Sequence, residues 1–173
     1  AIQPVQSWGN LCAGQLMVAL PFALMNGIMM HNNYLLLALF VLIWVNDSGA
    51  YIVGSLTAKL PKGNHKMFPR VSPAKSWEGL VGGILFSLLA GYIFFRVGWT
   101  AEMGLLNSLL FACAGSIFGT LGDLMESLFK RTLGVKDSGK IMPGHGGVLD
   151  RFDSLLLAIP VVYLLFVYLP FVL

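Results

Sequence analysis

The sequence predicts an all-α fold: a polytopic integral membrane protein with about five transmembrane helices in this chain. Only 11% of the 173 residues are charged and 57% are hydrophobic, whereas roughly a quarter of the residues in an average soluble domain are charged. Apolar runs of about 20 residues, the length that a helix needs to cross the hydrocarbon core, recur along the chain. Most of the charges gather in two segments between these runs, which predicts a polar site on one side of the membrane.

Five apolar segments are expected to cross the membrane as helices. The first tolerates Pro21, because neighbouring helices can satisfy the carbonyl that a proline leaves unbonded. The second is apolar apart from Asn46 and Asp47, and the fourth turns polar in its last two turns. In chain order the segments are Leu11–Met30, Tyr34–Leu56, Leu80–Val97, Gly104–Phe129 and Ser154–Leu173.

The basic residues predict the orientation of the chain in the membrane. The segment 57–79 carries five Lys or Arg residues against Glu78 alone, and the segment 130–153 carries five more. The short links 31–33 and 98–103 carry none. Positive residues favour the cytoplasmic side, so both basic segments and the N-terminus are expected there, and the C-terminus on the opposite side. For 57–79, a topology signal that also attracts anionic lipid is as good an explanation as a functional site. It does not explain 130–153, because topology does not need Asp137, Asp150 and Asp153.

The end of the fourth span carries a polar face. Asp123, Glu126, Ser127 and Lys130 follow the i, i+3, i+4, i+7 spacing of one helix face. The two carboxylates, one turn apart in a hydrophobic run, repel each other unless a divalent cation or a Lys or Arg lies between them. The alternative is an amphipathic exit helix whose charges pair along its surface. Small residues that let another helix approach closely precede this face: Ala112, Gly115, Ser116 and Gly119.

The stretch 127–153 combines eight charged residues with a loop rich in Gly and Pro. Glycines allow a backbone to approach a ligand closely, and we interpret His145, which lies among them, as a ligand contact. Asp150 and Asp153 lie one turn apart where the last span begins, a position at which the helix dipole favours carboxylates. Capping of that helix is the alternative role for Asp150.

These features together predict a site at the cytoplasmic surface of the membrane. Carboxylates that hold Mg²⁺ beside Lys and Arg side chains that hold phosphates are typical of phosphoryl or nucleotidyl transfer. The sequence contains no Walker A pattern and no set of Cys and His residues that suits zinc. It therefore favours a membrane enzyme that acts on phosphates, with no nucleic acid as a partner.

At these positions the sequence resembles the phosphatidate cytidylyltransferases, or CDP-diacylglycerol synthases. The family signature reads here as Ser127, Lys130-Arg131, Lys136-Asp137, Gly139, Pro143, His145-Gly146-Gly147, Asp150-Arg151 and Asp153, with every spacing kept. Met142 stands where Leu, Ile or Phe is commoner. The upstream segments "DSGAY", "VSPAKSWEG" and "LGDLMES" also look like family segments, so the resemblance covers about residues 40–160.

The resemblance implies the reaction CTP + phosphatidic acid → CDP-diacylglycerol + pyrophosphate, with Mg²⁺ as cofactor and a second cation left open. It also implies an all-helical membrane enzyme that forms a homodimer and has membrane lipids as partners. The compact loops are typical of a bacterial protein, which predicts the bacterial inner membrane as the location, with an organelle membrane as the alternative. Bacterial members usually have several more N-terminal spans, and this sequence starts at Ala1 rather than Met. We therefore expect residues 1–173 to be a single transmembrane catalytic domain, the C-terminal part of a longer member.

The resemblance also implies roles for individual residues. Asp123 and Asp150 would hold the metal. The predicted catalytic residues are Lys130, Arg131, Lys136, Asp137, His145, Arg151 and Asp153. The Lys and Arg side chains would bind phosphates, and the two Asp are second choices as metal ligands or would orient Lys and Arg. The predicted substrate-binding residues are Asp47, Ser72, Lys75, Ser127, Lys140, Gly146 and Gly147. Ser72 and Lys75 are candidates for the lipid phosphate, and Asp47 either anchors Lys75 or approaches the metal.

Other functions are compatible with parts of the pattern. A secondary transporter also buries acids, but it predicts polar groups near mid-membrane and in both halves of the fold. An enzyme that uses CTP on another lipid, such as a polyprenol or an isoprenoid ether phosphatidate, would share the polar motif. A non-catalytic remnant is a further alternative. The motif of the CDP-alcohol phosphotransferases is absent from the sequence.

Overall fold

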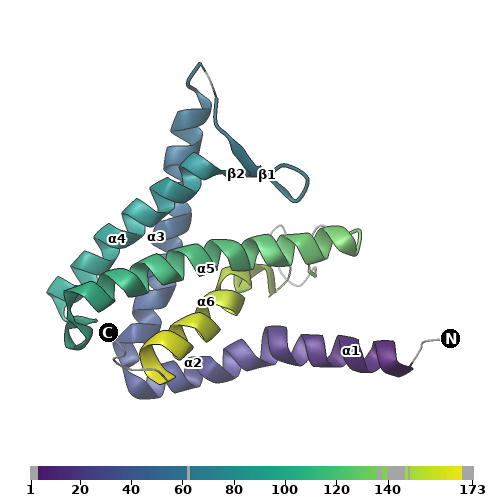
Figure 1. Ribbon diagram of the computed structural model, residues 1–173, viewed down its shortest axis with the longest axis horizontal. Coiled ribbons are helices and arrows are strands. Elements are labelled where there is room, and N and C mark those ends of the chain that lie inside the picture. The colour runs from purple at the N-terminus through teal and green to yellow at the C-terminus, as the bar shows by residue number, and fades with distance from the viewer. Residues whose placement is uncertain (1–3, 62, 136–137, 140–146, 148, 169–173) are drawn as a thin grey trace.

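The computed structural model describes residues 4–61, 63–135, 138–139, 147 and 149–168, and Figure 1 shows their arrangement. Six α-helices dominate it: α1 Pro4–Gly14, α2 Leu20–His31, α3 Asn33–Ala58, α4 Trp77–Val97, α5 Gly104–Thr132 and α6 Asp153–Tyr163. Short π-helical segments lie at Gln15–Ala19 and Leu164–Tyr168, and 3-10 turns at Ala101–Met103 and Leu149–Arg151. A hairpin of two strands, β1 Lys66–Phe68 and β2 Ser72–Ser76, separates α3 from α4.

Four of the described helical segments are long and apolar enough to cross a membrane: Leu11–His31, Asn33–Ala58, Trp77–Val97 and Ala101–Thr132. They match the first four predicted spans to within a few residues. The fifth corresponds to the shorter apolar helix Asp153–Val167, and residues 169–173 lie outside the described part of the chain. The prediction of a mostly helical, polytopic membrane protein is confirmed.

The first span contains a π-helical segment next to its proline. Pro21 lies at the start of α2, directly after Gln15–Ala19, and the amide of Leu20 donates to the carbonyl of Gln15. A proline has no amide hydrogen, so it removes one hydrogen bond from a helix interior. The wider turn accommodates this loss without ending the helix, and α1 and α2 continue in nearly the same direction in Figure 1.

Glycines set the spacing between α3 and α4, which lie side by side as an antiparallel pair (Figure 1). A Cβ atom at Gly82 would lie 2.5 Å from Val53 Cβ, and one at Gly49 would lie 2.8 Å from Phe86 Cβ. Small residues at such positions let two membrane helices approach until their backbones nearly touch. This close packing fixes the position of α3, which carries Asn46 and Asp47, against α4.

The hydrophobic core draws its buried residues from α2, α3, α4, α5 and α6. Leu39 and Leu42 of α3 and Phe111 of α5 are fully buried there, together with Ala158 and Val162 of α6. The predicted small-residue face of the fourth span is buried in α5, and a Cβ atom at Gly115 would lie 2.5 Å from Leu42 Cδ2. The prediction that another helix approaches this face is confirmed: α3 approaches it at Gly115, and α4 approaches it at Ala112, where a Cβ atom at Gly91 would lie 2.7 Å from Ala112 Cβ.

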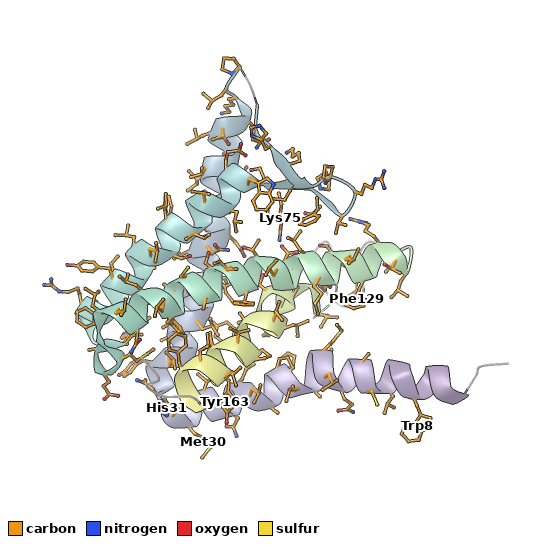
Figure 2. All side chains as sticks on the ribbon, viewed as in Figure 1. Trp8, Met30, His31, Lys75, Phe129 and Tyr163 are labelled. Atoms are coloured by element: carbon orange, nitrogen blue, oxygen red, sulfur yellow. The ribbon has the colours of Figure 1, made fainter. Side chains whose placement is uncertain are left out.

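The β-hairpin is a difference from the all-α prediction, which treated residues 57–79 as a basic loop. Its strands are antiparallel, with Phe68 opposite Ser72 and Lys66 opposite Ser76. The amide and ring of His65 contact the carboxylate of Glu78, and the amide of Trp77 donates to the carbonyl of His65. These contacts close the base of the hairpin on the start of α4. The hairpin thereby carries Lys75, on β2, toward α5 (Figure 2).

Candidate active site

The polar residues converge where the hairpin and the start of α6 meet the second half of α5. The first contact is an ion pair between Lys75 of β2 and Asp123 of α5, with 2.5 Å between Nζ and Oδ2. Lys75 Nζ also donates to the carbonyl oxygen of Thr120 at 3.3 Å. The other carboxylate oxygen of Asp123 accepts from Ser127 Oγ at 3.3 Å. Both side chains of the pair are partly exposed, at 22% and 31%, so a ligand has access to the pair.

Two more carboxylates flank Asp123. Asp47 of α3 and Asp153 at the start of α6 both interact electrostatically with it. The close crossing of α5 and α6 brings Asp153 there, because a Cβ atom at Gly122 would lie 2.7 Å from the carbonyl oxygen of Asp153. Three helices thus each contribute one acid: Asp123 and Asp47 interact with Lys75, and Asp153 interacts with Asp123. We call Lys75, Asp47, Asp123 and Asp153 the first cluster.

A second cluster lies about one turn further along α5 and consists of Glu126, Lys130 and Asp150. Lys130 Nζ lies 2.5 Å from Glu126 Oε2 and 2.7 Å from Asp150 Oδ1. The Glu126 side chain is only 5% exposed, Asp150 12% and Lys130 16%. Glu126 and Asp150 also interact electrostatically with each other, so the ammonium group of Lys130 separates two carboxylates that would otherwise repel. Asp153 interacts with Glu126 as well as with Asp123, and it connects the two clusters.

Asp150 also organises the segment before α6. Its Oδ2 atom accepts from the amide of Gly147 at 2.6 Å, the amide of Ser138 at 3.0 Å and the hydroxyl of Ser138 at 2.9 Å. Burial alone would raise the pKa of Asp150, but the hydrogen bonds from Lys130, Gly147 and Ser138 outweigh it and hold that pKa well below its usual range. Asp150 is therefore a carboxylate at neutral pH. A Cβ atom at Gly147 would collide with Ser138 Oγ and lie 2.8 Å from the amide of Gly139, which explains the glycine.

The structure brings together most of the predicted site residues that it describes. Asp47, Lys75, Asp123, Ser127 and Asp153 meet in or beside the first cluster, and Lys130, Gly147 and Asp150 in or beside the second. Ser72 begins β2, the strand that presents Lys75. Arg131 is exposed and donates from Nε to the carbonyl of Val71 at 3.5 Å, and Arg151 is exposed in the turn before α6. Lys136, Asp137, Lys140, His145 and Gly146 lie outside the described residues.

The two predicted metal ligands fall in different clusters, each beside a lysine. Asp123 pairs with Lys75 and Asp150 with Lys130. Within the described residues, no three Asp, Glu, His or Cys side chains converge as ligands of one ion. Mg²⁺ prefers carboxylate oxygens and keeps several water ligands, so the chemistry of the carboxylates in each cluster fits this ion.

Sequence reasoning missed several residues of the site. Glu126 was visible on the polar face of the fourth span but received no role. Asn46 was visible as a polar residue inside an apolar span, which signals a function in a membrane protein. Thr120 and Ser138 carried no signal, because their contacts depend on the approach of Lys75 and Asp150 from distant parts of the chain.

Comparison with known proteins agrees with the resemblance seen in the sequence. Residues 5–169 match the Cytidylyltransferase family. Over 133 residues, 75% of this chain and 44% of the relative, the sequence is 44% identical to a protein of Haemophilus influenzae named phosphatidate cytidylyltransferase. Proteins of the same name from Staphylococcus haemolyticus and Staphylococcus aureus are 47% and 42% identical over 136 residues, 78% of this chain and 49% of each relative. The chain spans about half the length of these relatives. It belongs to the cytidylyltransferase family.

Proposed function

We propose that this chain transfers the cytidylyl group of CTP to phosphatidic acid, and that residues 1–173 form one transmembrane catalytic domain. Family membership and the name shared by relatives at about 45% identity support this activity. The observation that carries it is the pair of adjoining carboxylate–lysine clusters, Asp123 with Lys75 and Asp150 with Lys130, at the polar end of long apolar helices. With Mg²⁺ bound to its carboxylates, such a site would bind two anionic phosphate groups while the acyl chains of one substrate stay in the bilayer.

The chemistry requires positioning more than acid–base catalysis. An oxygen of the phosphatidate phosphate attacks the α-phosphorus of CTP, a new P–O bond forms, and the bond to the β-phosphate breaks to release pyrophosphate. A phosphomonoester has a second pKa of about 6, so the attacking group is largely dianionic at neutral pH and needs no strong base. The main barrier is the repulsion between two anions, which fixed positive charges and correct alignment reduce.

The described residues divide this task between the two clusters. Lys75, with Ser72 on the same strand, would bind the phosphate of the lipid. The hairpin holds Lys75 at the side of the helix bundle, where a lipid head group can approach. Lys130 would bind phosphates of CTP, supported by Arg131 and Arg151, whose planar guanidinium groups can each contact two oxygens. Ser127 would donate to a phosphate oxygen or to a water, and Asp153 and Asp47 would orient Lys75. We assign Lys136, Asp137, Lys140, His145, Gly146 and Gly147 to the CTP side from their family positions alone.

Asp123 and Asp150 would hold Mg²⁺, and the remaining carboxylates could hold a second cation. When bound, the ion would neutralise charge on the phosphates of CTP. Ion binding at these carboxylates would release Lys75 from Asp123 and Lys130 from Asp150, while Lys130 would keep its ion pair with Glu126. The lysines would then be available to the substrates. The same set of side chains thus serves a resting state, in which charges pair internally, and a loaded state.

The charge distribution supports a cytoplasmic site. Both basic segments flank the two clusters, and positive residues favour the cytoplasmic side of the membrane. We propose that the protein resides in a bacterial inner membrane, as its relatives are bacterial, and that it works as a homodimer.

The direct test uses purified protein in detergent with phosphatidic acid and [α-³²P]CTP, with and without Mg²⁺. We expect label in the lipid phase only when Mg²⁺ is present, and none from the Asp150→Asn variant. Label that appears with a polyprenol but not with phosphatidic acid would overturn the lipid assignment. No lipid label from any acceptor, with the protein shown to be folded, would overturn cytidylyl transfer itself.

A further inference from the structure

We propose that Asn46 is a positioning residue. From within the membrane span α3, it fixes the positions of Asp47, Asp123 and Lys75 relative to one another, so that the first cluster can bind substrate and metal. This inference rests on the proposed function for its meaning, since it explains how the acid cluster of that site keeps its geometry. Asn46 is 2% exposed in the middle of α3. A buried amide in an apolar helix costs free energy unless its hydrogen bonds are satisfied, so its partners indicate what it is for.

The amide of Asn46 bridges α3 to two successive turns of α5. Its Oδ1 atom accepts from Ser116 Oγ at 2.5 Å, and its Nδ2 atom donates to Thr120 Oγ1 at 3.3 Å. Nδ2 also lies 3.4 Å from Oδ1 of Asp47, the adjacent residue in the first cluster. One side chain thus ties the helix of Asp47 to the helix of Asp123.

The bridge continues into the first cluster through Thr120. Thr120 accepts a hydrogen bond from Asn46 at its hydroxyl, and its carbonyl oxygen accepts another from Lys75 Nζ at 3.3 Å. Lys75 in turn pairs with Asp123, three residues further along α5. An unbroken series of polar contacts therefore leads from Ser116 through Asn46 and Thr120 to the ion pair, and it joins α3, α5 and β2.

The fourth helix prevents Asn46 from turning away. A Cβ atom at Gly83 of α4 would lie 2.5 Å from Asn46 Oδ1 and 3.0 Å from its carbonyl oxygen. The amide therefore sits against bare backbone on one side and against α5 on the other. A shorter or apolar side chain at position 46 would remove the hydrogen bonds that fix the position and rotation of α3 relative to α5.

The chain offers a matched control for the simple loss of a buried hydrogen bond. Ser108 and Ser116 are both fully buried serines of α5, two turns apart. Ser108 Oγ contacts Thr100 Oγ1 at 2.7 Å and the carbonyl of Gly104 at 2.8 Å, whereas Ser116 contacts Asn46. Replacement of either serine by alanine removes a buried hydroxyl from the same helix, but only Ser116 belongs to the series that reaches Lys75.

The experiment compares Asn46→Ala, Ser116→Ala and Ser108→Ala in detergent-purified protein by two readouts besides turnover. Binding of Mn²⁺, a paramagnetic substitute for Mg²⁺, is titrated by electron paramagnetic resonance, and the acetylation rate of Lys75 in metal-free buffer is measured by mass spectrometry. We expect Asn46→Ala and Ser116→Ala to weaken Mn²⁺ binding about tenfold or more, the usual effect of losing a residue that orients ligands, and to speed acetylation of Lys75. Ser108→Ala should lower the unfolding temperature but change both readouts by less than about twofold.

A conservative pair at Thr120 sharpens the test. Thr120→Ser keeps the hydroxyl and should behave as the wild type, whereas Thr120→Val removes it at nearly constant shape and should behave as Asn46→Ala. Equal Mn²⁺ affinity and equal Lys75 reactivity in Asn46→Ala and Ser108→Ala would overturn the inference and leave Asn46 a purely structural residue. Wild-type protein that makes no CDP-diacylglycerol would overturn the proposed function, yet the acetylation of Lys75 would still decide the role of Asn46.

Discussion

The contact that most clearly predicts a measurable loss of stability is that of Lys130 with two carboxylates. Replacement by methionine, Lys130→Met, keeps the length of the side chain and removes its charge. It deletes one ion pair to Glu126, whose side chain is 5% exposed, and one to Asp150, whose side chain is 12% exposed. The variant therefore leaves the buried carboxylate of Glu126 next to the partly buried carboxylate of Asp150 with no positive charge between them.

The size of the effect follows from what each carboxylate retains. Hydrogen bonds to charged groups contribute about 1.5–3 kcal/mol each, and removal of one partner of a buried ion pair costs about 3–5 kcal/mol. Asp150 keeps its donors from Ser138 and Gly147, and Glu126 can reduce the repulsion by taking up a proton. Both effects favour the low end, so we expect a loss of about 3 kcal/mol in the free energy of unfolding.

Equilibrium unfolding in mixed micelles, in buffer that contains EDTA, measures this value without reference to activity. The double variant Lys130→Met with Glu126→Gln should recover at least about 1 kcal/mol, because it removes one of the two unpaired charges. Glu78→Gln is the control: it neutralises the pair with His65, whose side chain is 81% exposed, and should cost only a small fraction of the loss expected for Lys130→Met. A loss below about 1 kcal/mol for Lys130→Met, or no recovery in the double variant, would refute the reasoning.

Three further predictions concern other parts of the site. Gly83→Ala should destabilise the protein by about 1–3 kcal/mol in the same unfolding assay, because its Cβ atom would lie 2.5 Å from Asn46 Oδ1, whereas Gly14→Ala, with no atom within 4 Å, should not. The pKa of Asp150 is lowered in the folded protein, so the stability that Asp150 contributes is present above its unfolded pKa of 3.8 and is lost as the pH falls through and below that value. Between pH 6 and about pH 3, the unfolding temperature of Asp150→Asn should therefore fall less than that of the wild type. Gly147→Ala should lower the rate of cytidylyl transfer about tenfold or more, because Gly147 is packed against Ser138 and Gly139. Gly134→Asn should retain activity, because Gly134 has no such contact. Equal activity of the two variants in the lipid-labelling assay would contradict this.

The parts of the structure that follow from local patterns were predictable, and those that depend on helix approach were not. Hydropathy identified the four long spans, and the i, i+4 spacing placed Asp123 with Ser127 and Glu126 with Lys130, as the structure confirms. The alternative of charges that pair along the helix agrees with the i, i+4 ion pair of Glu126 with Lys130, although the Glu126 side chain is only 5% exposed. Spacing within one helix could not indicate that a hairpin would bring Lys75 to Asp123.

The glycine contacts explain why that information was missing. Gly122 lets the start of α6 approach α5, and Gly83 lets α4 approach Asn46, and each depends on the relative position of two helices. A sequence shows that a glycine is present but not which backbone lies against it. The metal prediction illustrates the consequence: Asp123 and Asp150 were assigned to one ion from their family positions, whereas each now lies beside its own lysine.

The central claim, that the two clusters form one catalytic site, is tested most directly by the kinetics of a double variant. The rate of cytidylyl transfer to phosphatidic acid is measured over a range of Mg²⁺ concentrations for Asp123→Asn, Asp150→Asn and the variant that carries both. Residues that act as a unit lose their effect together, so the double variant should be no slower than the slower single variant. Losses that multiply, or an Asp123→Asn variant with near-normal turnover and unchanged Mg²⁺ dependence, would show that the clusters act separately.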